Sequence, residues 1–128
     1  ELSKINTFKN IHQMVSTIEA QIENDVFFSK ILKSTFPMGS MTGAPKIKTM
    51  KIIDELEETS RGIYSGAIGY IDPNKNFDFN VVIRTIIYDD KLSKISVNVG
   101  SGITFKSDPK DEYEECLTKI DALKKSLS

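Results

Sequence analysis

The fold is decided by the stretch IYSGAIGYIDPNKNFDFNVVIRTIIYDDKLSKISVNVGSG, residues 63–102. Residues 63–71 have the β-branched and aromatic side chains of a strand, and residues 72–76 form a turn sequence around a proline. The strand after this turn has a two-residue period, and its repeating face is Phe77, Phe79, Val81, Ile83, Thr85 and Ile87. A second turn at residues 89–91 leads to a third alternating run, made of Ile95, Val97 and Val99. These patterns predict an antiparallel meander.

Helical patterns lie on both sides of these strands. Asp25 can cap a helix that ends near Thr35, and Pro45 is a natural first-turn residue for a second helix that ends near Ser60. The residues at 107–109, Ser-Asp-Pro, predict the start of a third helix. The apolar stripe of this third helix is Tyr113, Cys116, Leu117, Ile120, Leu123 and Leu127. We therefore expect an α+β fold in which helices cover a largely antiparallel sheet.

Residues 8–22 admit two interpretations. A helical stripe fits their apolar positions, which are Phe8, Ile11, Val15, Ile18 and Ile22. The β-branched run at residues 15–18 favours a strand instead. Periodicity alone slightly favours the helix.

The composition bounds the class of protein. A chain of 128 residues is the size of one domain, and we find no repeat or linker that would divide it. Its 17 Lys+Arg against 18 Asp+Glu give no net field for nucleic acid or an acidic membrane. No apolar run approaches the ~20 residues that span a bilayer, and no secretory leader is visible, so we expect a cytoplasmic protein. The sequence begins at Glu1 rather than Met, and we expect it to be a fragment of a longer chain.

Residues 36–46, FPMGSMTGAPK, form a glycine-bearing loop that leads into the second predicted helix. Unpaired backbone N–H groups at a helix start can bind an anion, and Ser40 and Thr42 add hydroxyl donors. Lysines occupy the beginning of this helix and acidic residues its end, the reverse of what the helix dipole favours. The sequence leaves two interpretations open, an anion site and an ordinary loop between helices.

Arginine is rare in this chain: only Arg61 and Arg84 are present. Arg84 lies within the apolar run at residues 81–86, where a guanidinium inside a sheet needs an anionic partner. Its planar fork suits a carboxylate, which either an internal Asp or Glu or a ligand can supply. Arg61, beside Gly62 at a turn, is interpreted as a surface residue.

Glu112, Glu115 and Lys119 have the spacing i, i+3, i+7 and share one face of the third predicted helix. Two carboxylates one turn apart can hold Mg²⁺, although two ligands do not complete an octahedron. The alternative is a solvated face, because Glu115 and Lys119 also have the order of a favourable ion pair. The glycines of residues 100–102 permit close approach of backbone to a ligand, or mark a bulge.

Two reactive residue types give no sign of a catalytic cluster. Cys116 lies on an apolar stripe and is interpreted as an inert buried thiol. His12, the single histidine, has no Cys, His or Ser-Asp arrangement near it. We interpret both residues as structural.

Taken together, the motifs resemble the C-terminal part of the chorismate-utilising enzymes, which include anthranilate, aminodeoxychorismate and salicylate synthases. The motifs that carry the resemblance are residues 36–46, IIDELE at 52–57, RGIYSGAIGY at 61–70, VIRT at 82–85, GSGI at 100–103, SDP at 107–109 and EYEE at 112–115. They follow in unbroken order along nearly the whole chain. The resemblance implies a four-layer α/β/β/α fold, in which residues 10–22 form a strand.

The same resemblance implies roles in binding chorismate. Arg84 and Tyr64 would bind the enolpyruvyl carboxylate, together with backbone N–H groups of Gly100, Ser101 and Gly102.

The remaining implied roles concern the ring and the metal. Ser40 would line the ring site, and Lys119 would lie beside the ring carboxylate. Glu112 would bind Mg²⁺ directly, and Glu115 would support the ion through water.

The resemblance also implies an activity and a partner. Residues 39–46 are similar to the aminodeoxychorismate synthase branch, which aminates chorismate to 4-amino-4-deoxychorismate for para-aminobenzoate and folate synthesis. A glutamine amidotransferase subunit or domain would supply the ammonia. The alternatives are anthranilate synthase component I and a non-catalytic domain that binds carboxylates or a partner protein.

Two departures from the family pattern bear on catalysis. Gln13 stands where many members have a histidine, with His12 one residue earlier. The family's catalytic lysine and a further pair of metal-binding glutamates belong to segments that precede Glu1. We therefore assign no catalytic nucleophile or base, and expect the fragment alone to be inactive.

Overall fold

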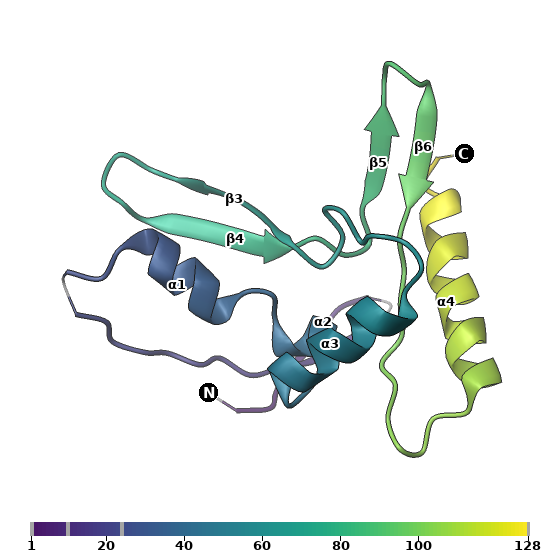
Figure 1. The fold of residues 1–128 in the computed structure, drawn as a ribbon, viewed down its shortest axis with the longest axis horizontal. Coiled ribbons are helices and arrows are strands. Elements are labelled where there is room, and N and C mark those ends of the chain that lie inside the picture. The colour runs from purple at the N-terminus through teal and green to yellow at the C-terminus, as the bar shows by residue number, and fades with distance from the viewer. Residues whose placement is uncertain (1, 10, 24, 128) are drawn as a thin grey trace. The chain divides into compact units, whose positions relative to one another are not determined.

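A computed structural model of the chain describes residues 2–9, 11–23 and 25–127 (Figure 1). Its elements in chain order are β1 (Lys4–Thr7), β2 (His12–Val15), α1 (Phe28–Thr35), α2 (Gly39–Thr42), α3 (Lys46–Leu56), β3 (Ala67–Ile71), β4 (Phe77–Val81), β5 (Ile86–Asp89), β6 (Lys94–Val97) and α4 (Pro109–Lys124). The chain divides into two compact units, residues 1–31 and residues 32–128. The α+β class and the antiparallel strand pairing expected from the sequence are confirmed.

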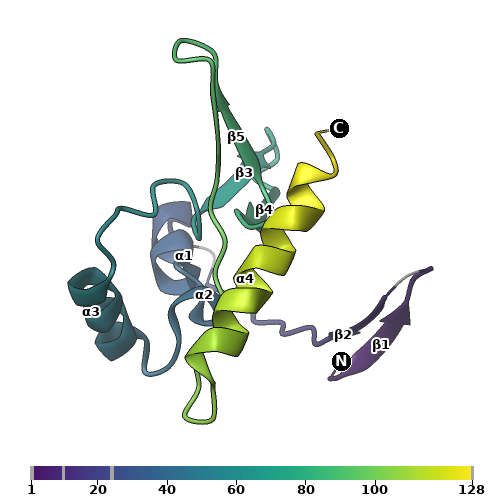
Figure 2. The ribbon, with the colours of Figure 1, turned by 90° about the vertical axis from the view of Figure 1, so that its right-hand side faces the viewer.

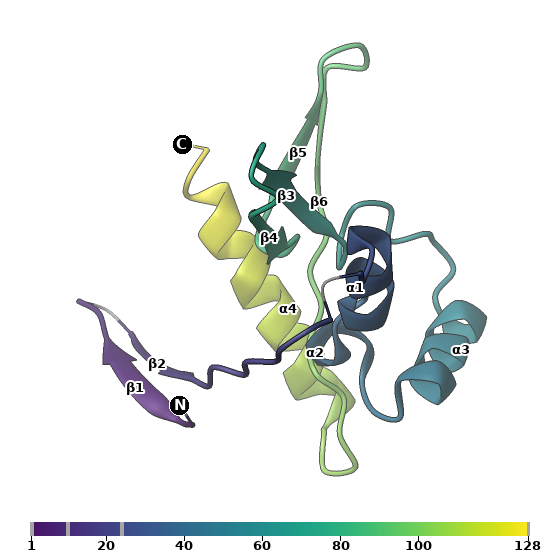
Figure 3. The same ribbon diagram turned by 90° about the vertical axis from the view of Figure 1, so that its left-hand side faces the viewer.

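The first unit contains an antiparallel hairpin of β1 and β2, visible in Figure 3. Lys4 pairs with Val15 and Thr7 with His12, so the strand interpretation is correct for this part of residues 8–22 and the helical one is wrong. The partner strand β1 has no alternating apolar pattern of its own. Pairing between separated segments therefore decides the structure here, which periodicity within one segment does not reveal.

The second unit contains two further hairpins, β3–β4 and β5–β6 (Figure 1). The turn predicted at residues 72–76 joins β3 to β4, with the Asn76 amide donating to the Asp72 carboxylate at 2.8 Å. The predicted strand through residues 81–86 is interrupted, and among the described residues β5 pairs with β6 rather than with β4. Arg84 has a φ of 50°, outside the range of a strand, which explains the break. The meander is therefore two separate hairpins.

Burial in the described residues is concentrated at one point of the second unit. Val82 and Ser65 are the residues below a tenth exposed among those described, at 2% and 5%. The Ser65 amide donates to the Val82 carbonyl, and the Val82 amide to the Gly66 carbonyl, each at 3.0 Å. This pair of bonds fixes a turn at residues 63–66 against the end of β4, so the strand predicted from residue 63 begins only at Ala67. By contrast the described residues leave apolar side chains of α3 uncovered, with Ile47 and Leu56 each 75% exposed.

The helices lie where the sequence predicts them, although α3 ends at Leu56 rather than near Ser60. α1 begins at Phe28 rather than at the expected cap Asp25, and α3 begins directly after Pro45. The predicted third helix is α4, the long helix at the C-terminal end in Figure 2. Its cap Asp108 accepts hydrogen bonds from the amides of Lys110 and Asp111, at 2.8 and 3.3 Å. No helix in the described part of the chain has the length and apolar character needed to cross a membrane.

Candidate functional site

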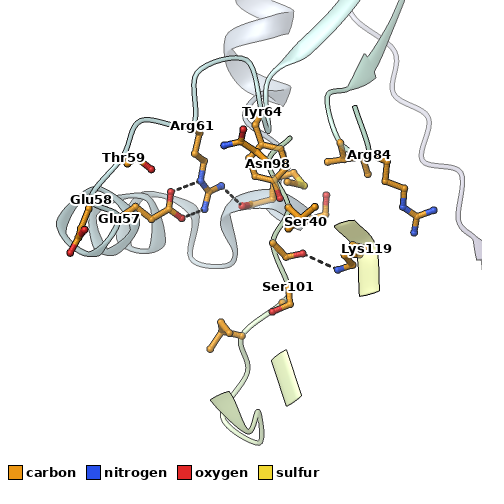
Figure 4. Close-up of a pocket in the computed structure, with 16 residues that line it drawn as sticks. Ser40, Glu57, Glu58, Thr59, Arg61, Tyr64, Arg84, Asn98, Ser101 and Lys119 are labelled. Carbon is orange, nitrogen blue, oxygen red and sulfur yellow. Dashed lines mark hydrogen bonds and ion pairs between the residues drawn. The ribbon is translucent and has the colours of Figure 1, made fainter. Parts of the chain in front are cut away.

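The second unit contains an open pocket of about 620 Å³, a volume suited to a small-molecule ligand (Figure 4). All seven residues to which substrate contacts are assigned from the sequence line it: Ser40, Tyr64, Arg84, Gly100, Ser101, Gly102 and Lys119. They come from five separate stretches of chain. Sequence reasoning missed the other lining residues, which are Met41, Glu57, Glu58, Thr59, Arg61, Ile83, Asn98, Val99 and Ile103.

The glycine-bearing loop contributes to the pocket through the short helix α2. Thr42 closes this single turn by donating its hydroxyl to the Met38 carbonyl at 3.1 Å. Gly43 then turns the chain with a φ of 97°, a conformation that favours glycine. Ser40 and Met41 line the pocket, whereas Pro45 and Lys46 at the start of α3 do not. The loop therefore supplies side chains from α2, and the helix start considered as an anion site lies outside the pocket.

Tyr64 lies against the backbone of Gly100. A Cβ built on Gly100 would come within 2.9 Å of the Tyr64 hydroxyl oxygen, so glycine permits this approach. Burial raises the pKa of Tyr64 above its ordinary value, while Arg61 and Lys119 oppose the rise. The phenol is therefore protonated at neutral pH and can donate a hydrogen bond into the pocket.

Arg84 lies in the bend between β4 and β5 rather than inside a strand, so the expectation of a guanidinium within a sheet is wrong. Its side chain is exposed, and Figure 4 shows the guanidinium directed away from Arg61 and Tyr64. Among the described residues no carboxylate pairs with it, so the internal ion pair considered from the sequence is not formed. Arg84 is thus a cation at the pocket available to an anionic ligand.

Lys119 joins α4 to the glycine segment. Its ammonium donates to the Gly100 carbonyl oxygen at 2.8 Å and forms an ion pair with Glu115 at 2.5 Å. The ion pair predicted from the i,i+4 spacing is therefore present, and Lys119 nevertheless lines the pocket. One of its three N–H donors remains for a ligand.

Glu112 is one turn before Glu115 on α4, near the hydroxyls of Ser107 and Ser101. Hydrogen bonds from Ser107 and, to a smaller extent, Ser101 lower the pKa of the Glu112 carboxyl, with a contribution from Lys119. The group is therefore ionised at neutral pH. No cluster of three His, Cys, Asp or Glu side chains suited to a metal occurs among the described residues. Two carboxylates are nonetheless a donor set of the kind that Mg²⁺ accepts, because this ion often takes one or two protein carboxylates and fills its shell with water and substrate oxygens.

Arg61 is the main residue that sequence reasoning misjudged. It lines the pocket, and its side chain is 25% exposed. Its Nε and one terminal nitrogen donate to the two Glu57 carboxylate oxygens at 2.8 and 2.6 Å (Figure 4). The i,i+4 spacing of Glu57 and Arg61 was the available signal, although α3 ends at Leu56.

The two residues interpreted as structural lie outside the pocket lining. Cys116 is half-buried on α4 rather than fully buried. His12 lies on β2, where its Nδ1 is 3.1 Å from the Thr7 hydroxyl of the paired strand. Gln13, at the family's histidine position, is exposed on the same strand. These positions give no chemical role to Cys116, His12 or Gln13.

Comparison with known proteins gives the family. The sequence profile of chorismate binding enzymes matches residues 1–125. The chain belongs to this family. A probable chloroplastic aminodeoxychorismate synthase from Oryza sativa subsp. japonica is 44% identical over 121 residues, which are 94% of this chain and 13% of that protein. Component 1 of anthranilate synthase from Acetivibrio thermocellus is 42% identical over 126 residues, or 98% of this chain and 25% of that protein.

The fold of this family member agrees with a solved structure. The crystal structure of anthranilate synthase component I from Streptococcus pneumoniae TIGR4 matches with a TM-score of 0.81 and 30% identity, covering 96% of this chain and 28% of that one. The chain thus spans between about an eighth and about a quarter of the length of these relatives.

Proposed function

We propose that the chain is the C-terminal part of the chorismate-binding catalytic domain of an aminodeoxychorismate synthase component I. The observation that carries the proposal is the gathering of seven residues from separate stretches around one pocket. Its walls combine the unpaired Arg84, the protonated Tyr64 and the ammonium of Lys119. A dicarboxylate such as chorismate matches these three groups in charge and hydrogen bonding.

Each residue then has a defined task in binding. Arg84 pairs with the enolpyruvyl carboxylate once its exposed side chain turns toward Tyr64, whose hydroxyl donates a further hydrogen bond to the same carboxylate. The close approach of Tyr64 to Gly100 keeps this hydroxyl near the backbone of the glycine segment. Lys119, anchored on the Gly100 carbonyl, faces the ring carboxylate, and Ser40 borders the ring.

Glu112 and Glu115 are the residues that would hold Mg²⁺, the first directly and the second through water. A bound Mg²⁺ would offset the charge of the ring carboxylate and assist departure of the C4 hydroxyl. The hydroxyls of Ser107 and Ser101 favour the ionised form of the Glu112 carboxyl by lowering its pKa. Neither glutamate lines the pocket itself, and Lys119, which does line it, forms the ion pair with Glu115 that connects them to it.

The amination requires ammonia, for which we propose a glutamine amidotransferase subunit or domain as the partner. The aminodeoxychorismate branch is supported by Ser40 and Thr42 in residues 39–46 and by the 44% identity to the rice relative. The anthranilate branch has the support of a 42% identical relative.

Product analysis separates these candidates. The complete protein, with chorismate, Mg²⁺ and ammonium, should form 4-amino-4-deoxychorismate, which keeps the enolpyruvyl group and has the corresponding mass. Fluorescent anthranilate, formed with loss of that group as pyruvate, would instead assign the chain to the tryptophan pathway. If neither product forms, a non-catalytic binding domain is favoured.

A further inference from the structure

Arg61 occupies a central place among the hydrogen bonds beside the pocket. Two of its nitrogens bind Glu57, and the third donates to the Met41 carbonyl at 2.9 Å and to the Ser65 hydroxyl at 3.4 Å. The guanidinium also lies 6.0 Å from the centre of the Tyr64 ring. Four of its five N–H groups are therefore engaged within the chain.

The partners of Arg61 adjoin residues that we assign to the substrate. Met41 follows Ser40 on α2, and Ser65 follows Tyr64. Ser65 is 5% exposed and is bonded through its amide to the Val82 carbonyl, two residues before Arg84. One guanidinium thus connects the segments that carry three pocket residues.

Among these contacts, the hydrogen bond to the Met41 carbonyl matters most for the stability of α2. A helix of four residues is not stable alone, so its place depends on contacts from other parts of the fold. The Met41 carbonyl is among the final carbonyls of this turn, which have no partner within the helix. A planar guanidinium can bind this carbonyl while keeping its bidentate bond to Glu57, a geometry that lysine cannot reproduce.

We propose that Arg61 is a positioning residue that sets the spacing between Ser40 on α2 and Tyr64 in the turn before β3, and so the fit of the substrate ring. The role rests on the proposed function, because it assumes that these two residues face chorismate. Arg61 acts through its neighbours and needs no bond to the substrate. Glu57 shares this positioning role, because the two hydrogen bonds that it accepts from Arg61 fix the plane of the guanidinium.

Steady-state kinetics on the complete enzyme test this role, with Arg61→Met and Arg61→Lys as variants. We expect Arg61→Met to raise KM for chorismate about tenfold and to lower kcat/KM further, because misplacement of a binding wall by about 1 Å has effects of up to ~10²-fold. Arg61→Lys should lie between this variant and the wild type. Lys124→Met is the matched control, since it removes an exposed pair with Asp121, at 3.8 Å, and should leave both constants unchanged.

KM distinguishes positioning from mere stability. A residue that only stabilises the fold lowers kcat in proportion to the folded fraction and leaves KM alone. If Arg61→Met does not fold, Glu57→Gln weakens the same fork while keeping Arg61, and should raise KM about threefold, consistent with loss of a charge-assisted bond. A wild-type KM in folded Arg61→Met, or in Glu57→Gln where Arg61→Met does not fold, overturns the proposal.

Hydrogen exchange provides a readout that needs no chorismate. The amides of Met41, Thr42 and Gly43 close the turn of α2 and should exchange faster in Arg61→Met, or in Glu57→Gln, while those of α4 stay unchanged. Unchanged exchange at α2 overturns the positioning role. A wild-type enzyme that consumes no chorismate overturns the proposed function instead, so the two failures are distinguishable.

Discussion

The Tyr64 hydroxyl oxygen lies so close to Gly100 that a Cβ at position 100 would come within 2.9 Å of it. The approach joins two residues 36 positions apart in sequence and brings a hydrogen-bond donor to the glycine segment of the pocket. Because the clashing atom is the far end of a side chain, the protein can relieve the clash by moving the hydroxyl. Function is therefore more sensitive than stability to a side chain at this position.

Gly100→Ala should lower kcat/KM for chorismate about five- to tenfold, because displacing a hydrogen-bonding group by a fraction of an ångström weakens binding geometry. The melting temperature of the complete enzyme should change little. Gly39→Ala is the matched control, since a Cβ there meets nothing within 4 Å, and it should retain wild-type kinetics. Equal effects of both substitutions would contradict the specific contact with Tyr64.

Arg84→Lys should weaken chorismate use by ~2–4 kcal/mol, the scale of losing one partner of a charge-assisted pair. Lysine keeps the charge but loses the bidentate fork. The melting temperature without ligand should stay nearly unchanged, because the described residues offer the Arg84 guanidinium no internal partner. Kinetics and thermal unfolding of the same variant give both values. A large loss of unliganded stability with near-normal kinetics would show an internal role instead.

The ion pair of Glu57 and Arg61 should make stability depend on pH. The hydrogen bond from Arg61 lowers the pKa of Glu57 below its ordinary value of 4.5. The contribution of this ion pair to the free energy of unfolding is therefore fully present above pH 4.5. It is lost as the pH falls through the lower pKa that Glu57 has in the folded protein. Since both side chains are partly exposed, we expect Glu57→Gln to cost about 0.5–1 kcal/mol at pH 7.

Melting temperatures of the complete enzyme at pH 7 and at pH 3 measure how much the pair of Glu57 and Arg61 contributes to stability at each pH. The difference between wild type and Glu57→Gln should be one or two degrees at pH 7 and smaller at pH 3. Glu58→Gln is the control, because Glu58 forms no ion pair with any described residue, and it should match the wild type at both pH values. A difference that grows toward acid would reverse the assigned sign.

Glu112→Gln should abolish chorismate turnover without unfolding the complete enzyme, because an amide is a poor ligand for Mg²⁺ compared with a carboxylate. Glu114→Gln on the exposed side of α4 should remain active. Calorimetry on the isolated chain should find only weak Mg²⁺ binding, since Glu112 and Glu115 supply part of an octahedral shell. Tight binding by the isolated chain, or an active Glu112→Gln enzyme, would contradict these roles.

The sequence predicts elements well where local signals agree. In α4 the cap Asp108, the following Pro109 and the apolar stripe all indicate one helix, and the structure has it. The prediction of a continuous strand is wrong at Arg84, because apolar alternation through residues 81–86 does not reveal a left-handed backbone conformation. The pairing of β2 with β1 is likewise invisible to the periodicity of either segment.

For the pocket, family motifs identify residues by type and order, and the seven residues they indicate do line one cavity. They do not indicate Arg61, whose partners include a backbone carbonyl 20 residues away. A bond to a carbonyl leaves no side-chain pattern in the sequence. The role of Arg61 can therefore be identified only from the folded structure.

The central claim is that this chain forms one wall of a chorismate site and depends on the rest of the domain for catalysis. Turnover of chorismate with Mg²⁺ and ammonium, measured side by side for the 128-residue chain and for the complete protein, tests it most directly. We predict turnover by the complete protein and only the uncatalysed background for the chain alone. Turnover by the chain alone, or none by the complete protein, would contradict the claim.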